Sequence, residues 1–121
     1  HGLMIWIEAF DSIYVLYADN IFSPKWERYS DPWVEGLPEE DPSIEPPPGL
    51  YEPVRGFGMV WRGDASIIVP RDRLGWALGP EFPLDTAYQC DSAPRYNTCF
   101  LIGPDGLLEL EPERSAWHPY P

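Results

Sequence analysis

The chain has 121 residues, a formal net charge of −12 and 16 prolines, together with six Trp, seven Tyr and five Phe. This length suits one domain or two very small sub-units. The negative charge argues against nucleic acid and anionic membrane surfaces as partners, since binding either needs a basic surface. No run approaches the roughly 20 apolar residues of a membrane span, so no membrane insertion is expected.

The first stretch of the chain predicts a β-hairpin. Residues 2–17 contain two runs rich in Val, Ile, Tyr and Trp on either side of a polar break at Asp11 and Ser12. Such residues favour pleated, half-buried surfaces, and two such runs joined by a short turn are typical of a hairpin. A third, short strand is expected at residues 25–29. Together these elements predict a first β sub-unit over residues 1–36.

Residues 37–53 differ sharply in composition, because prolines and acidic residues replace the aromatics. This composition predicts an extended linker with polyproline II character that lies against the surface. Two alternatives are a proline-motif ligand for a partner domain and a calcium site at residues 39–41. A solvated linker is preferred, because the prolines restrict the loop and no EF-hand spacing is present.

The remainder of the chain, residues 54–121, predicts a second β sub-unit. Glycines in its first strand suggest a bulge or close backbone packing. One short helical turn is possible near residues 71–78, where Gly79 and Pro80 end it. The expected strands are residues 54–62, 67–69, 86–90, 98–102 and 107–110.

A short repeat links the two sub-units. Met4-Ile5-Trp6 returns as Met59-Val60-Trp61, each time shortly after a glycine. We therefore expect an all-β protein of two small related antiparallel sub-units, joined by the proline-rich linker. Trp6 and Trp61 should be buried at equivalent places in the two.

Several of these motifs together resemble a known family. The glycine–aliphatic–Trp start of the first hairpin, and the segment Leu74-Gly75-Trp76-Ala77-Leu78-Gly79-Pro80-Glu81, are similar to LGFP repeats. Residues 33–38 and 48–51 also resemble segments of tandem β domains found at the ends of secreted bacterial proteins. The resemblance implies an extracellular protein that helps attachment to the cell envelope, and it brings no catalytic residues.

The two cysteines, Cys90 and Cys99, are nine positions apart on runs expected to form facing strands. A disulfide across the hairpin is favoured over a metal pair or free thiols, because the two histidines are at opposite ends of the chain. A disulfide implies an oxidising compartment, here extracellular or the cell surface. The chain starts at His1 inside a strand pattern, without a signal peptide, which predicts a processed or excised piece of a longer protein.

Catalytic motifs are absent from the sequence. There is no Gly-x-Ser-x-Gly, no internal histidine base, no phosphate loop and no dinucleotide fingerprint. Nothing selects a pair of carboxylates held apart as in a glycosidase. We therefore expect no enzyme activity, no cofactor and no metal site, with a small hydrolase as the least favoured alternative.

The tryptophans are the remaining candidates for a binding site. Trp26, Trp33 and Trp117 lie beside charged or proline residues and could stack on sugars, although burial in a core is the commoner role. The leading hypothesis is a non-catalytic extracellular module that binds envelope polysaccharide. The main alternative is a subunit of an extracellular filament or surface layer, where neighbouring copies cover the aromatics and the strand edges.

Overall fold

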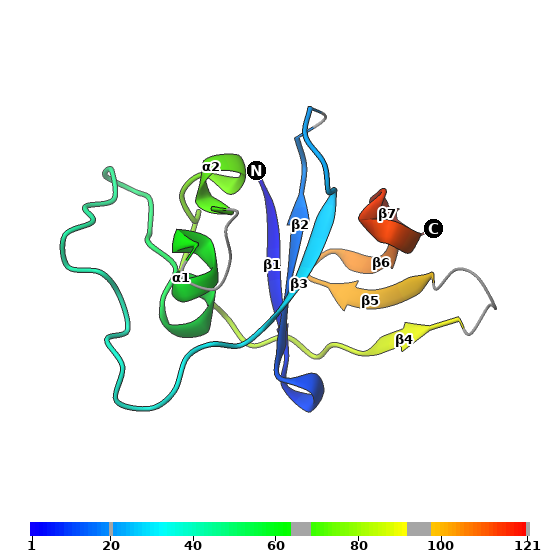
Figure 1. The fold of residues 1–121 in the computed structure, drawn as a ribbon, viewed down its shortest axis with the longest axis horizontal. Coiled ribbons are helices and arrows are strands. Elements are labelled where there is room, and N and C mark those ends of the chain that lie inside the picture. Colours follow the sequence, from blue (N-terminus) through cyan, green and yellow to red (C-terminus); the bar gives the residue numbers. More distant parts are fainter. Residues whose placement is uncertain (20, 64–68, 92–97, 121) are drawn as a thin grey trace.

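The computed structural model describes residues 1–19, 21–63, 69–91 and 98–120. It is mostly β, as predicted, with two antiparallel sheets and a few short helices (Figure 1). The three-stranded sheet joins β1 (Gly2–Ile7), β2 (Ser12–Tyr17) and β3 (Trp26–Ser30) in that order. The four-stranded sheet joins β4 (Tyr88–Cys90), β5 (Cys99–Gly103), β6 (Gly106–Leu110) and β7 (Trp117–Pro119) in that order. The helices are α1 (Arg55–Arg62) and α2 (Arg71–Leu74), with 3-10 turns at Glu8–Phe10 and Pro112–Arg114.

The predicted first hairpin is confirmed. Strands β1 and β2 pair from Gly2 opposite Tyr17 to Ile7 opposite Ser12. The connection is the 3-10 turn followed by Asp11, whose φ of 46° lies in the left-handed region. A short polar residue tolerates that conformation. The connection therefore starts three residues before the polar break seen in the sequence.

Strand β2 is buried on both of its faces. All six of its residues are buried, and their side chains alternate between two cores. Tyr14 and Leu16 face the four-stranded sheet, where they pack with residues that include Ile5, Leu101 and Leu110. On the opposite face lie Ile13, Val15 and Tyr17, which pack with Val60 of α1. The three-stranded sheet is thus a middle layer between the helices and the second sheet (Figure 1).

The strand predicted at residues 54–62 is wrong, because this segment forms helix α1. Its apolar side chains Phe57, Val60 and Trp61 follow helical spacing. Phe57 and Val60 pack with residues of β2, and Trp61 is also buried. Gly56 and Gly58 do not form the predicted bulge. They let atoms of Asp31 and Pro53 come close to the helix backbone. A Cβ on Gly56 would lie 2.1 Å from an Asp31 carboxylate oxygen, and one on Gly58 would lie 2.5 Å from the Pro53 carbonyl oxygen.

The linker prediction holds for the conformation of residues 37–50, which contain neither helix nor strand. The segment lies against the body of the protein through specific contacts. The buried carboxylate of Glu52 accepts hydrogen bonds from the Asp41 backbone N–H at 3.0 Å and from Arg62 of α1 at 3.1 Å. The sub-unit boundaries at residues 36 and 53 stay a prediction.

Three of the predicted C-terminal strands are present as β4, β5 and β6, with bounds shifted by one or two residues. The possible helical turn near residues 71–78 corresponds to α2, but the helix ends at Leu74 with Gly75 as its C-cap and not at Gly79 and Pro80 as predicted. Strand β7 was not predicted, because its three residues include a proline. The brief strand expected at residues 67–69 lies, except for Val69, outside the described residues.

The expected equivalence of Trp6 and Trp61 is wrong. Trp6 lies on an edge strand with 41% of its surface exposed, and its indole N–H donates to Asp11. Trp61 lies on a helix and is 3% exposed. Its ring contacts Trp76, and its indole N–H donates to the Gly75 carbonyl at 2.8 Å.

This contrast gives a prediction for two matched substitutions. Trp61→Ala should lower the free energy of unfolding by roughly 3–5 kcal/mol, because it opens a cavity beside Trp76. Trp6→Ala should cost no more than about 1 kcal/mol, as a partly exposed position. Urea denaturation of both variants measures the difference. Equal losses would contradict the assignment of Trp61 to the core.

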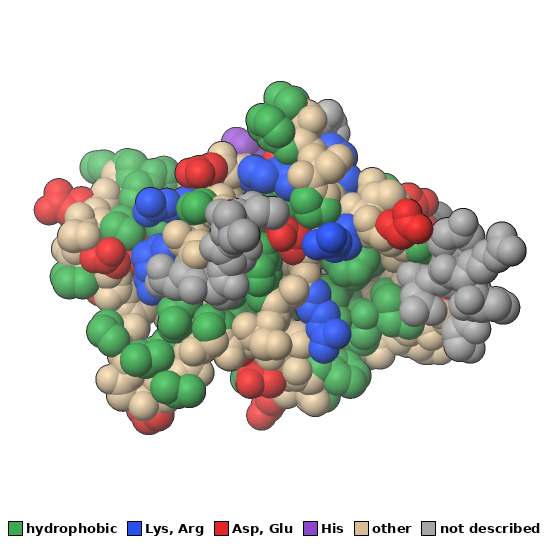
Figure 2. All heavy atoms as spheres, in the orientation of Figure 1, with side chains coloured by type: hydrophobic (Ala, Val, Ile, Leu, Met, Phe, Trp, Pro, Cys, Tyr) green, Lys and Arg blue, Asp and Glu red, His purple; other side chains and the backbone are tan. Residues whose placement is uncertain are grey.

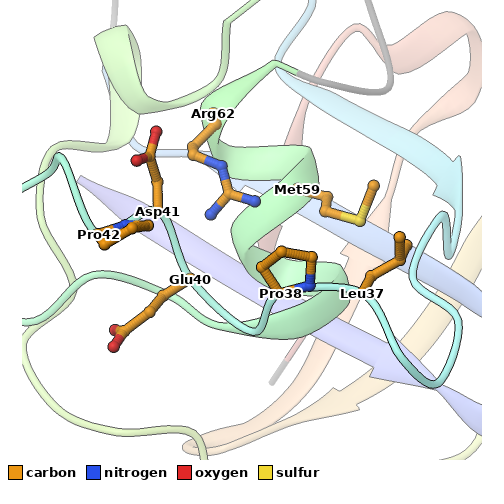
Figure 3. A pocket seen from close by; sticks show the side chains of 7 residues that line it. All are labelled: Leu37, Pro38, Glu40, Asp41, Pro42, Met59 and Arg62. Carbon is orange, nitrogen blue, oxygen red and sulfur yellow. The ribbon is translucent and has the colours of Figure 1, made fainter.

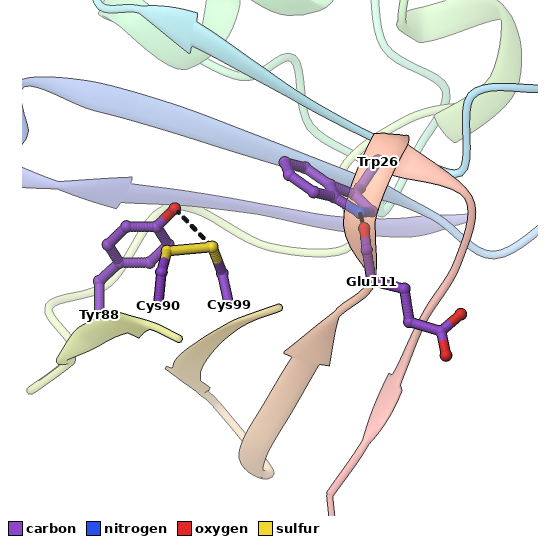
Figure 4. Close-up of a disulfide and its surroundings, with 5 residues drawn as sticks. All are labelled: Trp26, Tyr88, Cys90, Cys99 and Glu111. Atoms are coloured by element: carbon purple, nitrogen blue, oxygen red, sulfur yellow. Dashed lines mark hydrogen bonds between the residues drawn. A yellow bond between two sulfur atoms is a disulfide. The ribbon is translucent and has the colours of Figure 1, made fainter. Parts of the chain in front are cut away.

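The predicted disulfide between Cys90 and Cys99 is confirmed. The two cysteines are directly opposite each other on β4 and β5, and the Tyr88 hydroxyl lies 3.2 Å from the Cys99 sulfur (Figure 4). Cys99 is buried within the core between the sheets. The bond therefore fixes edge strand β4 to the rest of its sheet.

Mass measurement after alkylation under non-reducing conditions should show no labelled cysteine in the oxidised protein. Replacement of both cysteines by serine should lower the free energy of unfolding by roughly 2–3 kcal/mol, because the short closed loop no longer restricts the unfolded chain. Two labelled cysteines in protein secreted to an oxidising medium would contradict the pairing.

Candidate functional site

The three tryptophans predicted as ligand contacts are all partly buried, and the structure places them differently. Trp26 donates its indole N–H to the Glu111 carbonyl at 3.0 Å (Figure 4). Trp117 donates its indole N–H to the Tyr17 carbonyl at 2.7 Å. Both rings pack against the core between the sheets. The indole nitrogen of Trp33 is buried and has no hydrogen-bond partner among the described residues.

Of these three residues, Trp117 lines a surface hollow. The hollow has a volume of about 320 Å³ and lies where the end of β2 and the start of β3 meet the segment entering β7. Its lining residues are Tyr17, Ala18, Asp19, Lys25, Ser115, Ala116 and Trp117. Two aromatic residues are therefore combined with an ammonium group, a carboxylate and a hydroxyl. Trp26 and Trp33 do not line it.

Backbone hydrogen bonds hold the two sides of this hollow together. The Tyr17 N–H donates to the Lys25 carbonyl at 3.0 Å, and the Lys25 N–H donates to the Arg114 carbonyl at 2.8 Å. The indole of Trp117 adds the bond to Tyr17 described above. Side-chain changes at Lys25 leave these backbone bonds in place. The shape of the hollow therefore depends on backbone groups that a substitution of the Lys25 side chain does not remove.

Arg73 of α2 holds Asp19, which lines the hollow, in place. Its guanidinium lies over the Tyr17 ring, 3.7 Å from the ring centroid, and donates to both carboxylate oxygens of Asp19 at 2.7 and 2.8 Å. It also donates to the Phe22 and Pro24 carbonyls of the β2–β3 loop. A planar guanidinium can satisfy all these acceptors at once, which a lysine cannot. No feature of the local sequence pointed to Arg73, because its partners are about 50 residues away.

The ion pair has an electrostatic consequence. Hydrogen bonds from Arg73 hold the pKa of the Asp19 carboxyl well below its usual range. On the other side of the guanidinium, burial and a hydrogen bond to Glu27 raise the pKa of the Tyr17 hydroxyl. Glu27 is itself buried and accepts from the Tyr17 and Tyr29 hydroxyls at 2.6 Å each. Tyr17, which lines the hollow, is therefore also part of a buried hydrogen-bond network with Glu27 and Tyr29.

A second hollow, also of about 320 Å³, lies between the linker and α1 (Figure 3). Its lining residues are Leu37, Pro38, Glu40, Asp41, Pro42, Met59 and Arg62. Arg62 is engaged by buried Glu52. None of the described residues that line this hollow is aromatic, so it offers less to a sugar ring than the hollow beside Trp117.

The outer face of the four-stranded sheet carries a further group of side chains that are exposed or partly exposed. Gln89, Phe100, Glu109 and His118 are opposite one another on successive strands, so their side chains share this face. Next to this row, Tyr120 packs edge-on against Phe100 with ring centroids 5.4 Å apart. His118 was not predicted at this position, because strand β7 was not predicted.

Charge is distributed over the surface without a single acidic patch on the face shown in Figure 2. Acidic side chains there are scattered among hydrophobic ones. In the described part of the chain, no helix is long and apolar enough to cross a membrane. Comparison of the chain with protein-family models, curated protein sequences and solved structures found no match in any of the three.

The Asp19–Arg73 pair predicts how stability depends on pH. The folded-state pKa of Asp19 is depressed, so its stabilising effect is complete above the ordinary carboxyl pKa of about 4 and is lost as the pH falls below that value. Asp19→Asn should therefore destabilise the protein near neutral pH, and the difference from wild type should shrink on acidification. Urea unfolding between about pH 7 and pH 3 measures it. Arg73→Gln should remove the same pH dependence, and an Asp19→Asn effect that is constant across the range would contradict the ion pair.

Proposed function

We propose that the protein is a non-catalytic extracellular module that binds a glycan of the cell envelope in the hollow beside Trp117. The observation that carries this proposal is the composition of the hollow, where the aromatic residues Tyr17 and Trp117 lie together with charged and hydroxyl side chains, those of Asp19, Lys25 and Ser115. A sugar ring has an apolar face of C–H groups and an edge of hydroxyls. The indole suits the face, while the ammonium and the carboxylate suit the hydroxyls.

The size and position of the hollow support a short stretch of polysaccharide. Its volume of about 320 Å³ is at the lower end of the roughly 300–1,000 Å³ of small-molecule sites. The hollow is open at the surface, so residues in the middle of a long polysaccharide chain can enter it. Since a neutral glycan brings no charge, binding should depend little on salt, in contrast to a ligand attracted by charge.

Two further features support the extracellular location and the envelope as target. The Cys90–Cys99 disulfide is of a kind that persists in oxidising compartments. The first hairpin and residues 74–81 resemble LGFP repeats, and this resemblance supports a role in attachment to the cell envelope.

Assembly with neighbouring copies is the second candidate function, and one observation favours it. Ile102 and Leu107 are opposite each other on the outer face of the four-stranded sheet, and both are exposed. With the adjoining Phe100–Tyr120 pair, they form an apolar area that a second copy could cover. The edge strands β4 and β7 flank this area.

The glycan proposal predicts a specific pattern among variants. Soluble envelope polysaccharide titrated into dilute protein should shift the tryptophan fluorescence of the wild type. Lys25→Gln should weaken binding about tenfold, because a hydrogen bond to a charged group contributes about 1.5–3 kcal/mol. Trp117→Ala should abolish binding.

Trp6→Ala is the matched control, since Trp6 is exposed but lies outside the hollow, and its affinity should equal that of wild type. Circular dichroism checks that each variant is folded, and Lys25→Gln tests the site even if Trp117→Ala unfolds. Equal binding by wild type and Lys25→Gln, together with a loss in Trp6→Ala, would contradict the assigned site.

Light scattering over a wide range of protein concentration tests the second candidate without glycan. Association that Leu107→Lys removes would favour assembly through the outer face. A wild type that stays monomeric throughout would contradict it.

A further inference from the structure

Three potential metal ligands meet on the outer face of the four-stranded sheet. Glu109 of β6 and His118 of β7 are opposite each other, and Glu111 comes directly after the end of β6, two residues beyond Glu109. One ligand atom from each of the three lies within 4.8 Å of the others. We propose that Glu109, Glu111 and His118 form a binding site for a divalent transition metal of the zinc class.

The spacing fits a tetrahedral metal. Bonds of about 2.0–2.2 Å to imidazole nitrogen and carboxylate oxygen place neighbouring ligand atoms about 3.4 Å apart. The observed separations of up to 4.8 Å close to that value by small rotations of the glutamate side chains. The fourth position is open to water, as in zinc sites with three protein ligands.

The backbone under these ligands is held in place. The Glu111 N–H donates to the Ala116 carbonyl at 2.9 Å, and the Glu111 carbonyl accepts the indole N–H of Trp26 at 3.0 Å. Glu109 and His118 are within the paired part of β6 and β7. Ligands carried on such a scaffold lose little freedom when a metal binds.

Charge also favours a cation at this place. Two carboxylates lie close together in a chain of net charge −12. Over the described part of the chain, neither carboxylate forms an ion pair with a lysine or arginine, and His118 contacts Glu109. The side chains of His118 and Glu109 are 45% and 20% exposed, so an ion can reach them from solvent.

The ligand set distinguishes between metals. An imidazole nitrogen with two carboxylates suits Zn²⁺ and its transition-metal neighbours. Ca²⁺ takes about 6–8 oxygen ligands and Mg²⁺ needs a near-ideal octahedron of oxygens, neither of which this group supplies. The site should therefore prefer Zn²⁺ to both.

This inference does not depend on the proposed glycan site. Trp117 and His118 are adjacent on β7, so their side chains point to opposite faces. Trp117 is directed toward the core and the hollow, and His118 toward the outer surface. Lys25→Gln changes the hollow without altering the three metal ligands, and His118→Gln changes the metal ligands without altering the residues that line the hollow.

Calorimetric titration of Zn²⁺ into chelator-treated protein tests the proposal. The wild type should bind a single Zn²⁺ per chain, and His118→Gln should weaken the affinity by at least about 10–100-fold, the range already seen for loss of an outer-shell partner. Glu111→Gln should weaken it in the same direction. Co²⁺ should give a visible absorption band in wild type that His118→Gln removes. Mg²⁺ and Ca²⁺ should bind far more weakly.

Two controls separate this site from adventitious binding. Glu113→Gln alters an acidic residue near the group but outside it, and His1→Gln removes the other histidine of the chain. Both should bind Zn²⁺ as wild type does. Affinity unchanged in His118→Gln, affinity lost in His1→Gln, or Zn²⁺ binding no tighter than Mg²⁺ would each overturn the proposal. Since His118 is exposed, its variant keeps the fold, which circular dichroism verifies.

Discussion

The burial of β2 on both faces is the constraint on which the rest of the structure depends. All six residues of β2 are buried, so each face of this strand must be covered by another part of the protein. Helix α1 covers one face, and the four-stranded sheet covers the other. Among the described residues, three layers therefore pack together although the longest helix, α1, has only eight residues. Because successive side chains enter different cores, a register shift of one residue would exchange the contents of both.

This arrangement also determines where a ligand can bind. The end of β2 emerges from between the two layers, and there Tyr17 meets α2 on one side and β7 on the other. Arg73 binds the turn that follows, so helix, middle sheet and outer sheet all contribute to one surface hollow. Its walls are thus built by contacts between segments up to 100 residues apart. Such a site is a product of the layered fold and not of any local motif.

The sequence was informative where local pattern and tertiary environment agree. The alternating runs of the first hairpin, the cysteine pair and the proline-rich segment all took the predicted conformation. The segment at residues 54–62 did not, because its glycines and apolar residues suit both a strand and a helix, and the open face of β2 favours the helix. Contacts of Arg73 and of β7 were beyond prediction, since each depends on how the sheets pack. Trp117 was selected as a candidate for its neighbours, but its place in the hollow comes from β7.

Strand β7 shows how a short edge strand can serve two surfaces. Only three residues long, it pairs with β6 and presents Trp117 inward and His118 outward. The inward ring is held by the Tyr17 carbonyl, and the outward imidazole is placed beside Glu109 by the ladder. The indole bond resists a shift of one residue, because that shift would bury the imidazole and expose the ring. The same contact that builds the wall of the hollow therefore also fixes the ligand geometry on the opposite face.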